Sequence, residues 1–168
     1  AIFDGCEWFV ISGITPAISR TASEVAMVAV QEAQKRGIKV VCDMNYRTKL
    51  WRWEPPLSAR ELATRTMREL LPFVDLFIGG REDAEQMLGI KSDGRSLPDV
   101  ARQIVAQFPR IQRVAMTLRE GISATHNHFG GMIYDVASGK AFFAPAEGEL
   151  YQIASIVDRL GTGDAFTG

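Results

Sequence analysis

Short apolar runs and amphipathic stretches alternate along the first part of the chain. Residues 8–12 and 39–43 are apolar runs of strand length, and the segment 19–36 between them repeats its apolar residues at helical spacing. A strand, a helix and a strand joined by short turns form a βαβ unit, which makes the two strands parallel and the crossover right-handed. The first third of the chain therefore predicts a parallel sheet.

The alternation continues through most of the remaining chain. We expect helices at 58–70, 81–88 and 97–108, and strands at 74–78 and 113–117. Residues 124–134 and 140–144 alternate in polarity across a turn at 137–139, which predicts an antiparallel hairpin at a sheet edge. With no internal repeat and no interior boundary, the pattern predicts one α/β unit, a mostly parallel sheet carrying helices on both faces.

The composition is that of a globular protein without a transmembrane helix. The chain has 168 residues, 46% of them hydrophobic, with 19 basic and 20 acidic residues, so it can bury a core and its net charge attracts neither nucleic acid nor a membrane. No apolar run approaches the ~20 residues of a transmembrane helix. Cys6 and Cys42 lie beside apolar runs, which predicts two reduced core thiols in a cytoplasmic protein.

Polar and glycine-rich residues follow each predicted parallel strand, where ligands bind in open α/β sheets. These segments are 12–16, 43–52, 79–83 and 117–121. The second carries Arg47, Lys49 and Arg52, and a guanidinium there can hold a carboxylate or a phosphate through two parallel hydrogen bonds. A solvated basic loop would account for the same three residues.

The segment Gly161-Thr162-Gly163-Asp164 has the pattern of an anion site at the start of a helix. Two glycines around a small hydroxyl residue let successive backbone N–H groups point at one spot, and the helix dipole strengthens that site. Asp164 could accept a proton from an attacking hydroxyl, so the arrangement suits phosphoryl transfer. Taken alone, the same four residues also make an ordinary helix start.

The segment around Asp164 has a counterpart in a known family. Residues 158–166 resemble the D-T-x-G-A-G-D-A-F signature of ribokinase-like (PfkB-type) carbohydrate kinases, with Arg159 and Thr162 as departures. Residues 12–17, 43–51 and 117–120 resemble, in the same order, the 2-keto-3-deoxygluconate kinase branch. The resemblance implies that residues 1–168 are the central part of one ribokinase-like domain, incomplete at both ends. The N-terminal lid region and the C-terminal adenine-binding part would be absent, and the isolated chain would be inactive or very feeble.

The resemblance also implies an activity and a set of site residues. The activity would be phosphorylation of a sugar acid, most closely 2-keto-3-deoxygluconate to its 6-phosphate, with ATP and Mg²⁺. Asp164 would be the general base, and Gly161, Thr162 and Gly163 would cradle the transferred phosphoryl group. Arg47 would hold the substrate carboxylate, with Gly13, Ile14 and Asn45 beside the sugar. Thr117, Arg119, Gly121 and Asp83 would lie on the nucleotide side, Mg²⁺ being held mainly through phosphates and water.

Two other functions stay open on the sequence. A ribokinase- or fructokinase-type enzyme would act on a neutral sugar, which gives the Arg47 guanidinium no carboxylate to bind. A non-catalytic sensor of a sugar acid or nucleotide is favoured by Gly80, which stands where the family often has the asparagine of an Asn-x-x-Glu motif. An intact Asp164 argues against the sensor. A homo-oligomer of the full-length protein is left open.

Two pairs of residues have the spacing of a metal site and of a nucleic-acid-binding site. His126 and His128 alternate on a predicted strand and share a face, but the sequence offers no third ligand, so no metal site is predicted. Trp51 and Trp53 flank Arg52 in the way of an aromatic and basic stripe for single-stranded nucleic acid. With a net charge of -1, packing of this loop is the favoured interpretation.

Overall fold

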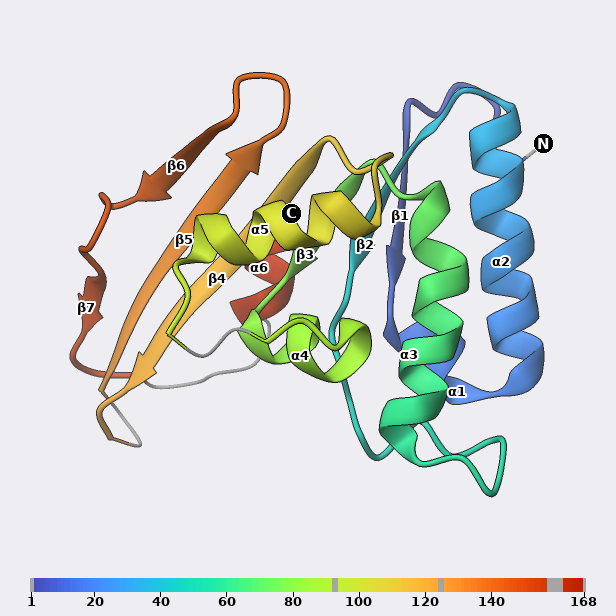
Figure 1. Ribbon diagram of the computed structural model, residues 1–168, viewed down its shortest axis with the longest axis horizontal. Helices are drawn as coiled ribbons and strands as arrows, with labels where there is room; N and C mark the ends of the chain where they lie inside the picture. The colour runs from blue at the N-terminus through green and yellow to red at the C-terminus, as the bar shows by residue number, and fades with distance from the viewer. Residues whose placement is uncertain (1, 92–93, 124–125, 157–161, 168) are drawn as a thin grey trace.

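A computed structural model describes residues 2–91, 94–123, 126–156 and 162–167, with backbone alone for 162–164. In this part of the chain one sheet has the strand order β1-β2-β3-β4-β5-β6, and β7 pairs with β5 (Figure 1). The strands are β1 (Trp8–Ser12), β2 (Lys39–Asp43), β3 (Leu76–Gly79), β4 (Arg113–Gly121), β5 (Asn127–Asp135), β6 (Lys140–Ala144) and β7 (Tyr151–Ile153). The helices are α1 (Ile14–Ile18), α2 (Arg20–Lys35), α3 (Ala59–Leu70), α4 (Arg81–Leu88), α5 (Leu97–Gln107) and α6 (Thr162–Thr167), with the 3₁₀ turn η1 (Leu71–Phe73) after α3.

Strand order explains how the helices are distributed. β1 to β4 are parallel and follow one another in chain order, whereas β4, β5 and β6 are antiparallel. Right-handed crossovers that always step in the same direction put their helices on one face, here α2, α3 and α5 (Figure 1). The second face carries α6, whose Phe166 packs against Val41, Ile78 and Ala115. Helices on both faces are confirmed, but the second face is much less covered in the described part of the chain.

Side-chain caps define where the helices begin. Ser58 Oγ accepts a hydrogen bond from the Glu61 backbone N–H at 3.2 Å, and the Glu61 carboxylate accepts from the Ser58 N–H at 2.9 Å. This capping box satisfies two backbone donors that the helix itself leaves unpaired. Ser96 caps α5 in a similar way, since its Oγ accepts from the Asp99 N–H at 3.2 Å. Gly89 ends α4 with a φ of 71°, the left-handed conformation that glycine adopts without a steric cost.

Several elements differ from the sequence prediction. The polar segment predicted at 12–16 runs into the short helix α1, and α2 then begins after Ser19, whose Oγ accepts from the Ala22 N–H at 3.1 Å. β3 begins two residues later than predicted, at Leu76. β4 extends beyond residue 117 to Gly121, and β7 was not predicted.

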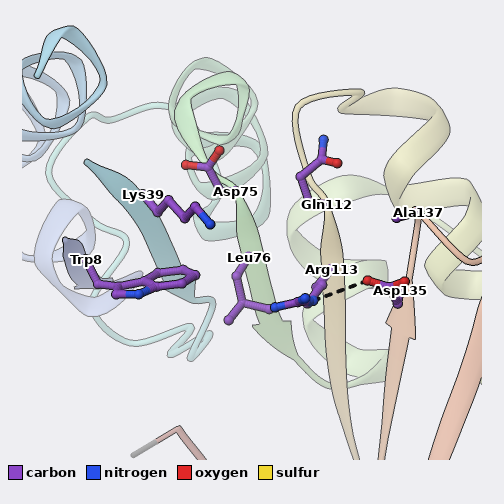
Figure 2. A pocket seen from close by; sticks show the side chains of 8 residues that line it. All are labelled: Trp8, Lys39, Asp75, Leu76, Gln112, Arg113, Asp135 and Ala137. Carbon is purple, nitrogen blue, oxygen red and sulfur yellow. Dashed lines mark hydrogen bonds and ion pairs between the residues drawn. The ribbon is translucent and has the colours of Figure 1, made fainter. Parts of the chain in front are cut away.

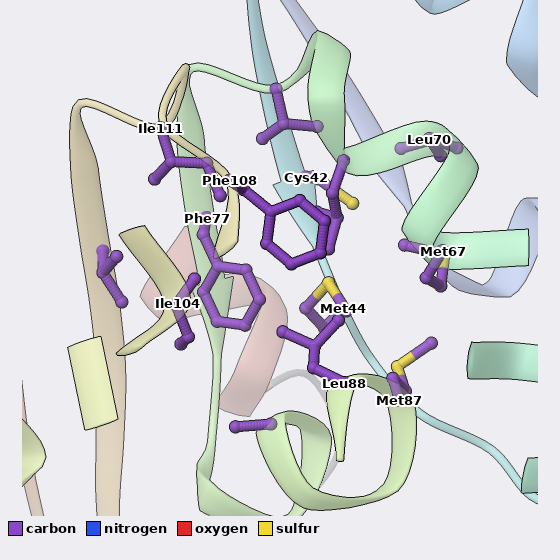
Figure 3. Packing of buried hydrophobic residues seen from close by; sticks show 14 of the residues in the cluster. Cys42, Met44, Met67, Leu70, Phe77, Met87, Leu88, Ile104, Phe108 and Ile111 are labelled. Carbon is purple, nitrogen blue, oxygen red and sulfur yellow. The ribbon is translucent and has the colours of Figure 1, made fainter. Parts of the chain in front are cut away.

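The main core lies between the sheet and the large helices (Figure 3). Cys42, Met44 and Phe77 from the sheet side pack against Leu88 and Ile104 from the helices, all of them fully buried. Burial raises the pKa of the Cys42 thiol, and the neighbouring charges of Asp43 and Asp83 act in the same direction. Cys42 is therefore an inert core thiol, as predicted.

The prediction that Cys6 is also a core thiol is wrong. Cys6 is exposed, because it lies in the connection before β1 and not within the sheet. Its Sγ lies 3.8 Å from the Ile2 carbonyl oxygen.

The second face of the sheet is apolar where α6 does not cover it. Trp8, Val10, Ile133 and Phe142 expose between 44% and 58% of their surface. Across the described residues, no helix combines the length and apolar character needed to cross a bilayer.

Candidate active site

Hydrogen bonds continue the parallel pairing past the last residues of the strands. The Gly13 N–H donates to the Asp43 carbonyl oxygen at 2.7 Å, and the Met44 N–H donates to the Ile78 carbonyl oxygen at 2.8 Å. The carboxyl ends of β1, β2 and β3 therefore meet at one edge of the sheet. The segments predicted to bind the sugar begin at this edge.

Gly13 permits a very close approach between two of these segments. A Cβ atom built on Gly13 would lie 2.1 Å from the Met44 carbonyl oxygen and 2.9 Å from its carbonyl carbon. The backbone after β1 thus packs directly on the backbone after β2. Ile14, half-buried, follows at the start of α1, beside the loop that carries Arg47.

Arg47 projects from the loop that follows β2. Asn45 has a φ of 40°, in the left-handed region that asparagine tolerates better than most residues, and this turn redirects the chain after Met44. Arg47 is exposed, and its Nη1 donates to the Tyr46 carbonyl oxygen at 3.0 Å. Among the described residues, no carboxylate forms an ion pair with this guanidinium. Its remaining donors are accordingly available for a ligand.

The two tryptophans of this loop pack into the fold, as predicted. Trp51 is 1% exposed, and the Trp53 Nε1–H donates to the Pro16 carbonyl oxygen at 3.1 Å. The Arg20 guanidinium lies 5.3 Å from the centre of the Trp53 ring. These contacts tie the loop that carries Arg47 to α1 and α2.

Asp83 in the first turn of α4 joins two neighbouring segments of the site. Its Oδ1 accepts from the Tyr46 N–H at 2.8 Å, and its Oδ2 accepts from the Gly80 N–H at 2.7 Å. A Cβ on Gly80 would lie 3.7 Å from Thr117 Oγ1, an ordinary contact, so Thr117 of β4 lies beside the same turn. Asp83 and Thr117, both predicted for the nucleotide side, are thus close to each other.

Asn127 is a site residue that the sequence reasoning missed. It is 4% exposed and lies opposite Gly121 in the register of β4 and β5. With its amide assigned to match its neighbours, Oδ1 accepts from Arg119 Nη2 at 3.2 Å and Nδ2 donates to the His126 carbonyl oxygen at 3.1 Å. The buried amide therefore orients Arg119. Its sequence signal is an asparagine at an inward position between two histidines.

The motif helix α6 is anchored over β5. Phe166 Cε2 would lie 2.7 Å from a Cβ built on Gly131, so the ring occupies the space that a side chain would fill. The ring also makes an edge contact with Phe129, at 6.4 Å between centroids. Gly131 pairs with Thr117, which brings α6 to the part of the sheet where Thr117 lies. Gly161 lies outside the described residues, as do the side chains of Thr162 and Asp164, so their roles stay predictions.

Substituting Gly131 by alanine is expected to displace α6. The new methyl group would overlap the Phe166 ring, and relief requires the ring and the helix to move, at a cost of about 1–3 kcal/mol in the free energy of unfolding. We expect activity to fall about tenfold, because small misplacements of catalytic groups are costly. Urea denaturation and a kinase assay on the full-length gene product measure both effects.

The double variant Gly131→Ala/Phe166→Leu is the control, because leucine lacks the overlapping ring atoms. It should recover part of the lost activity. A double variant that behaves as the sum of the two single changes would contradict the contact as the cause.

Two further clusters lie near the ends of the strands, one beside the end of β4 and one at the opposite end of the sheet. The rings of His126 and His128 make an edge contact at 5.4 Å between centroids, and His128 Nδ1 lies 3.6 Å from Glu120 Oε2. The described residues contain no group of three side chains suited to a metal ion. The histidine pair is a ring contact at the loop end of the β4–β5 hairpin.

A pocket of about 190 Å³ lies at the opposite ends of the strands (Figure 2). Lys39, Leu76 and Arg113 line it, and these are the first residues of β2, β3 and β4. Arg113 pairs with Asp135 at 3.3 Å, and Asp75 pairs with Arg110 at 3.0 Å. The Lys39 ammonium lies 5.1 Å from the centre of the Trp8 ring, so the charged side chains of this pocket are engaged in contacts within the protein.

The known proteins that this chain resembles include carbohydrate kinases. No family model matches the chain. The 2-dehydro-3-deoxygalactonokinase of Haloferax volcanii is 31% identical over 160 residues, which make up 95% of this chain and 42% of that protein. A PfkB family carbohydrate kinase from Listeria grayi and the 2-dehydro-3-deoxygluconokinase from Thermotoga maritima are each 34% identical, with a TM-score of 0.84.

Each of these two structures covers 99% of this chain, and the chain covers 47% of each of them. The chain thus spans less than half the length of the relatives it matches. The similarity to these relatives in sequence and in fold extends over nearly all of this chain. The chain is therefore a homologue of the PfkB-type carbohydrate kinases, with the ribokinase-like fold of the corresponding part of those proteins.

Proposed function

We propose that the protein is an ATP-dependent kinase that phosphorylates the primary hydroxyl of a 2-keto-3-deoxy sugar acid. Two of the relatives are named as kinases of such acids, since 2-dehydro and 2-keto describe the same group. The observation that carries the proposal is the exposed Arg47 guanidinium, in the loop that leaves the carboxyl end of β2 where Met44 packs against Gly13. A carboxylate is the ligand that matches this fork of donors.

The proposed reaction divides the work among the site residues. Arg47 holds the carboxylate end of the substrate, with Ile14 and Asn45 beside the sugar. Asp164 accepts the proton of the 6-hydroxyl while the oxygen of that hydroxyl forms a bond to the γ-phosphorus of ATP. The bond between that phosphorus and the ADP oxygen breaks. The backbone N–H groups of Gly161, Thr162 and Gly163 stabilise the charge on the transferred group.

The nucleotide side is proposed to consist of Thr117, Arg119 and Gly121 at the end of β4. Bound Mg²⁺ would neutralise charge on the phosphates. Both oxygens of Asp83 already accept backbone hydrogen bonds, and the described residues offer no cluster of three potential ligands. The resemblance implies an ion held mainly through phosphates and water.

Replacing Arg47 by glutamine tests the choice of substrate. We expect kcat/KM for the sugar acid to fall on the order of 10²-fold, because a charge-assisted pair of hydrogen bonds is lost. The assay couples ADP release by the full-length gene product to 2-keto-3-deoxygluconate, 2-keto-3-deoxygalactonate, gluconate, fructose and ribose. Arg52→Gln is the matched control, since it removes the same charge from the same loop and should keep most of the activity.

The other outcomes separate the alternatives. If the protein turns over fructose or ribose and Arg47→Gln leaves that activity unchanged, the protein is a sugar kinase but not a sugar-acid kinase. Binding of a sugar acid without turnover of any substrate would favour a non-catalytic sensor.

A further inference from the structure

Asp83 connects the two sides of the proposed site through its carboxylate. One oxygen accepts from the Tyr46 N–H at 2.8 Å and the other from the Gly80 N–H at 2.7 Å. Tyr46 is the residue before Arg47, and Gly80 adjoins Thr117. A single half-buried side chain therefore joins the loop after β2 to the turn after β3, and Asp83 itself lies 37 residues after Tyr46 in sequence.

These bonds hold a part of the backbone that the sheet no longer pairs. The Met44 N–H still donates to the Ile78 carbonyl oxygen, in continuation of the β2–β3 pairing. The turn at Asn45, with its φ of 40°, takes the chain out of that pattern. The N–H of Tyr46, the residue after this turn, donates to the Asp83 carboxylate and not to a strand neighbour. Asp83 thus fixes the backbone from which Arg47 projects.

We propose that Asp83 is a positioning residue that sets the Arg47 loop relative to the nucleotide end of the site, a role that rests on the proposed function. Hydrogen bonds to an ionised carboxylate are shorter and stronger than those between neutral groups, which suits a short bridge between two loops. The alternative role is direct support of the metal and phosphates. The two N–H donors come from the two segments that must be held together, which is the geometry that positioning requires.

The variant Asp83→Asn removes one of the two acceptors. The NH₂ group of the asparagine would face one of the two backbone N–H groups, of Tyr46 or of Gly80. Two donors cannot form a hydrogen bond with each other, so one of the two hydrogen bonds is lost. We expect KM for the sugar acid to rise on the order of tenfold, the effect of losing a hydrogen bond to a charged group. KM for ATP and the Mg²⁺ concentration that gives half-maximal rate should stay within about twofold, because the phosphates gain or lose no direct contact.

Asp83→Glu is the second variant, and it keeps the charge. One added methylene moves both oxygens away from the Tyr46 and Gly80 N–H groups. Positioning predicts a raised KM for the sugar acid in this variant too, whereas a role that needs only negative charge near the metal predicts none. Glu82→Gln is the matched control, since Glu82 is an exposed carboxylate in the same helical turn and should leave both KM values unchanged.

Amide hydrogen exchange provides a readout that does not depend on activity. In Asp83→Asn, the Tyr46 or Gly80 amide should exchange faster than in the wild type, while amides within β2 keep their protection. Unchanged exchange at both positions would overturn the bridge. A raised Mg²⁺ or ATP requirement with an unchanged KM for the sugar acid would overturn the positioning role. Wild-type protein that turns over no sugar acid would refute the proposed function, and exchange would still decide whether the bridge exists.

Discussion

Replacing Asp164 by asparagine is expected to lower kcat on the sugar acid by about 10³-fold, within the range that a general base contributes. The amide has nearly the same shape as the carboxylate but cannot take the proton of the substrate hydroxyl. The loss should appear in kcat and leave KM for the sugar acid nearly unchanged, because substrate binding is assigned to Arg47 and the end of β1. A coupled ADP-release assay on the full-length gene product measures both constants.

A matched control separates this effect from a general loss of negative charge. Glu69→Gln removes a carboxylate from an exposed position on α3 and should leave kcat unchanged. Thermal unfolding of Asp164→Asn should coincide with that of the wild type. A variant that is folded and retains more than about a tenth of the wild-type kcat would show that another group, or water, takes the proton.

The strands and large helices could be predicted because their signals are local. Ser58 and Glu61 stand at the spacing of a capping box, and both of its hydrogen bonds form. Gly89 follows the last apolar residue of α4 and ends that helix. The apolar run of β2 is buried on both faces, with Val40 and Cys42 in the main core and Val41 against the second face. Each signal depends on a few adjacent residues.

The elements that were missed depend on partners far away in the sequence. The last four residues of β4 include Arg119 and Glu120, which no strand pattern favours, yet β5 pairs with them residue by residue. β7 has three exposed residues and is a strand because it pairs with β5. α1 is five residues long and contains Pro16, too short for a periodic pattern.

In the site, too, local signals could be predicted from the sequence and contacts between distant segments could not. The segments that gather at the carboxyl edge of the sheet follow from strand order, so Gly13, Asn45 and Thr117 could be predicted to lie along the same edge. The Asp83 bridge and the buried Asn127 amide could not, because each requires the three-dimensional register of two segments. The resemblance assigned Asp83 to the nucleotide side, whereas its contacts reach the Arg47 loop as well.

Gly13 is the position where the fold and the proposed site are most tightly joined. Its φ of -61° and ψ of -11° are accessible to any residue, so glycine is not required for the backbone conformation. The requirement is space, because the Met44 carbonyl oxygen would lie 2.1 Å from a Cβ atom. That oxygen belongs to a backbone that the Met44 N–H ties to β3, and it cannot turn aside as a side chain could. The close contact sets the distance between Ile14 and the Arg47 loop.

Gly13→Ala is therefore expected to lower the free energy of unfolding by about 3 kcal/mol, at the upper end of the usual cost of overpacking. Urea denaturation of the full-length gene product measures this change, and KM for the sugar acid should rise in whatever fraction remains folded. Gly80→Ala is the matched control, since its φ of -102° is equally ordinary and its Cβ would meet only contacts of 3.6 Å and more. Its stability should stay within about 0.5 kcal/mol of the wild type. Equal stability for Gly13→Ala and Gly80→Ala would mean that the ends of β1 and β2 can separate freely, and the sugar side of the site would then lack the rigid base that the Arg47 assignment requires.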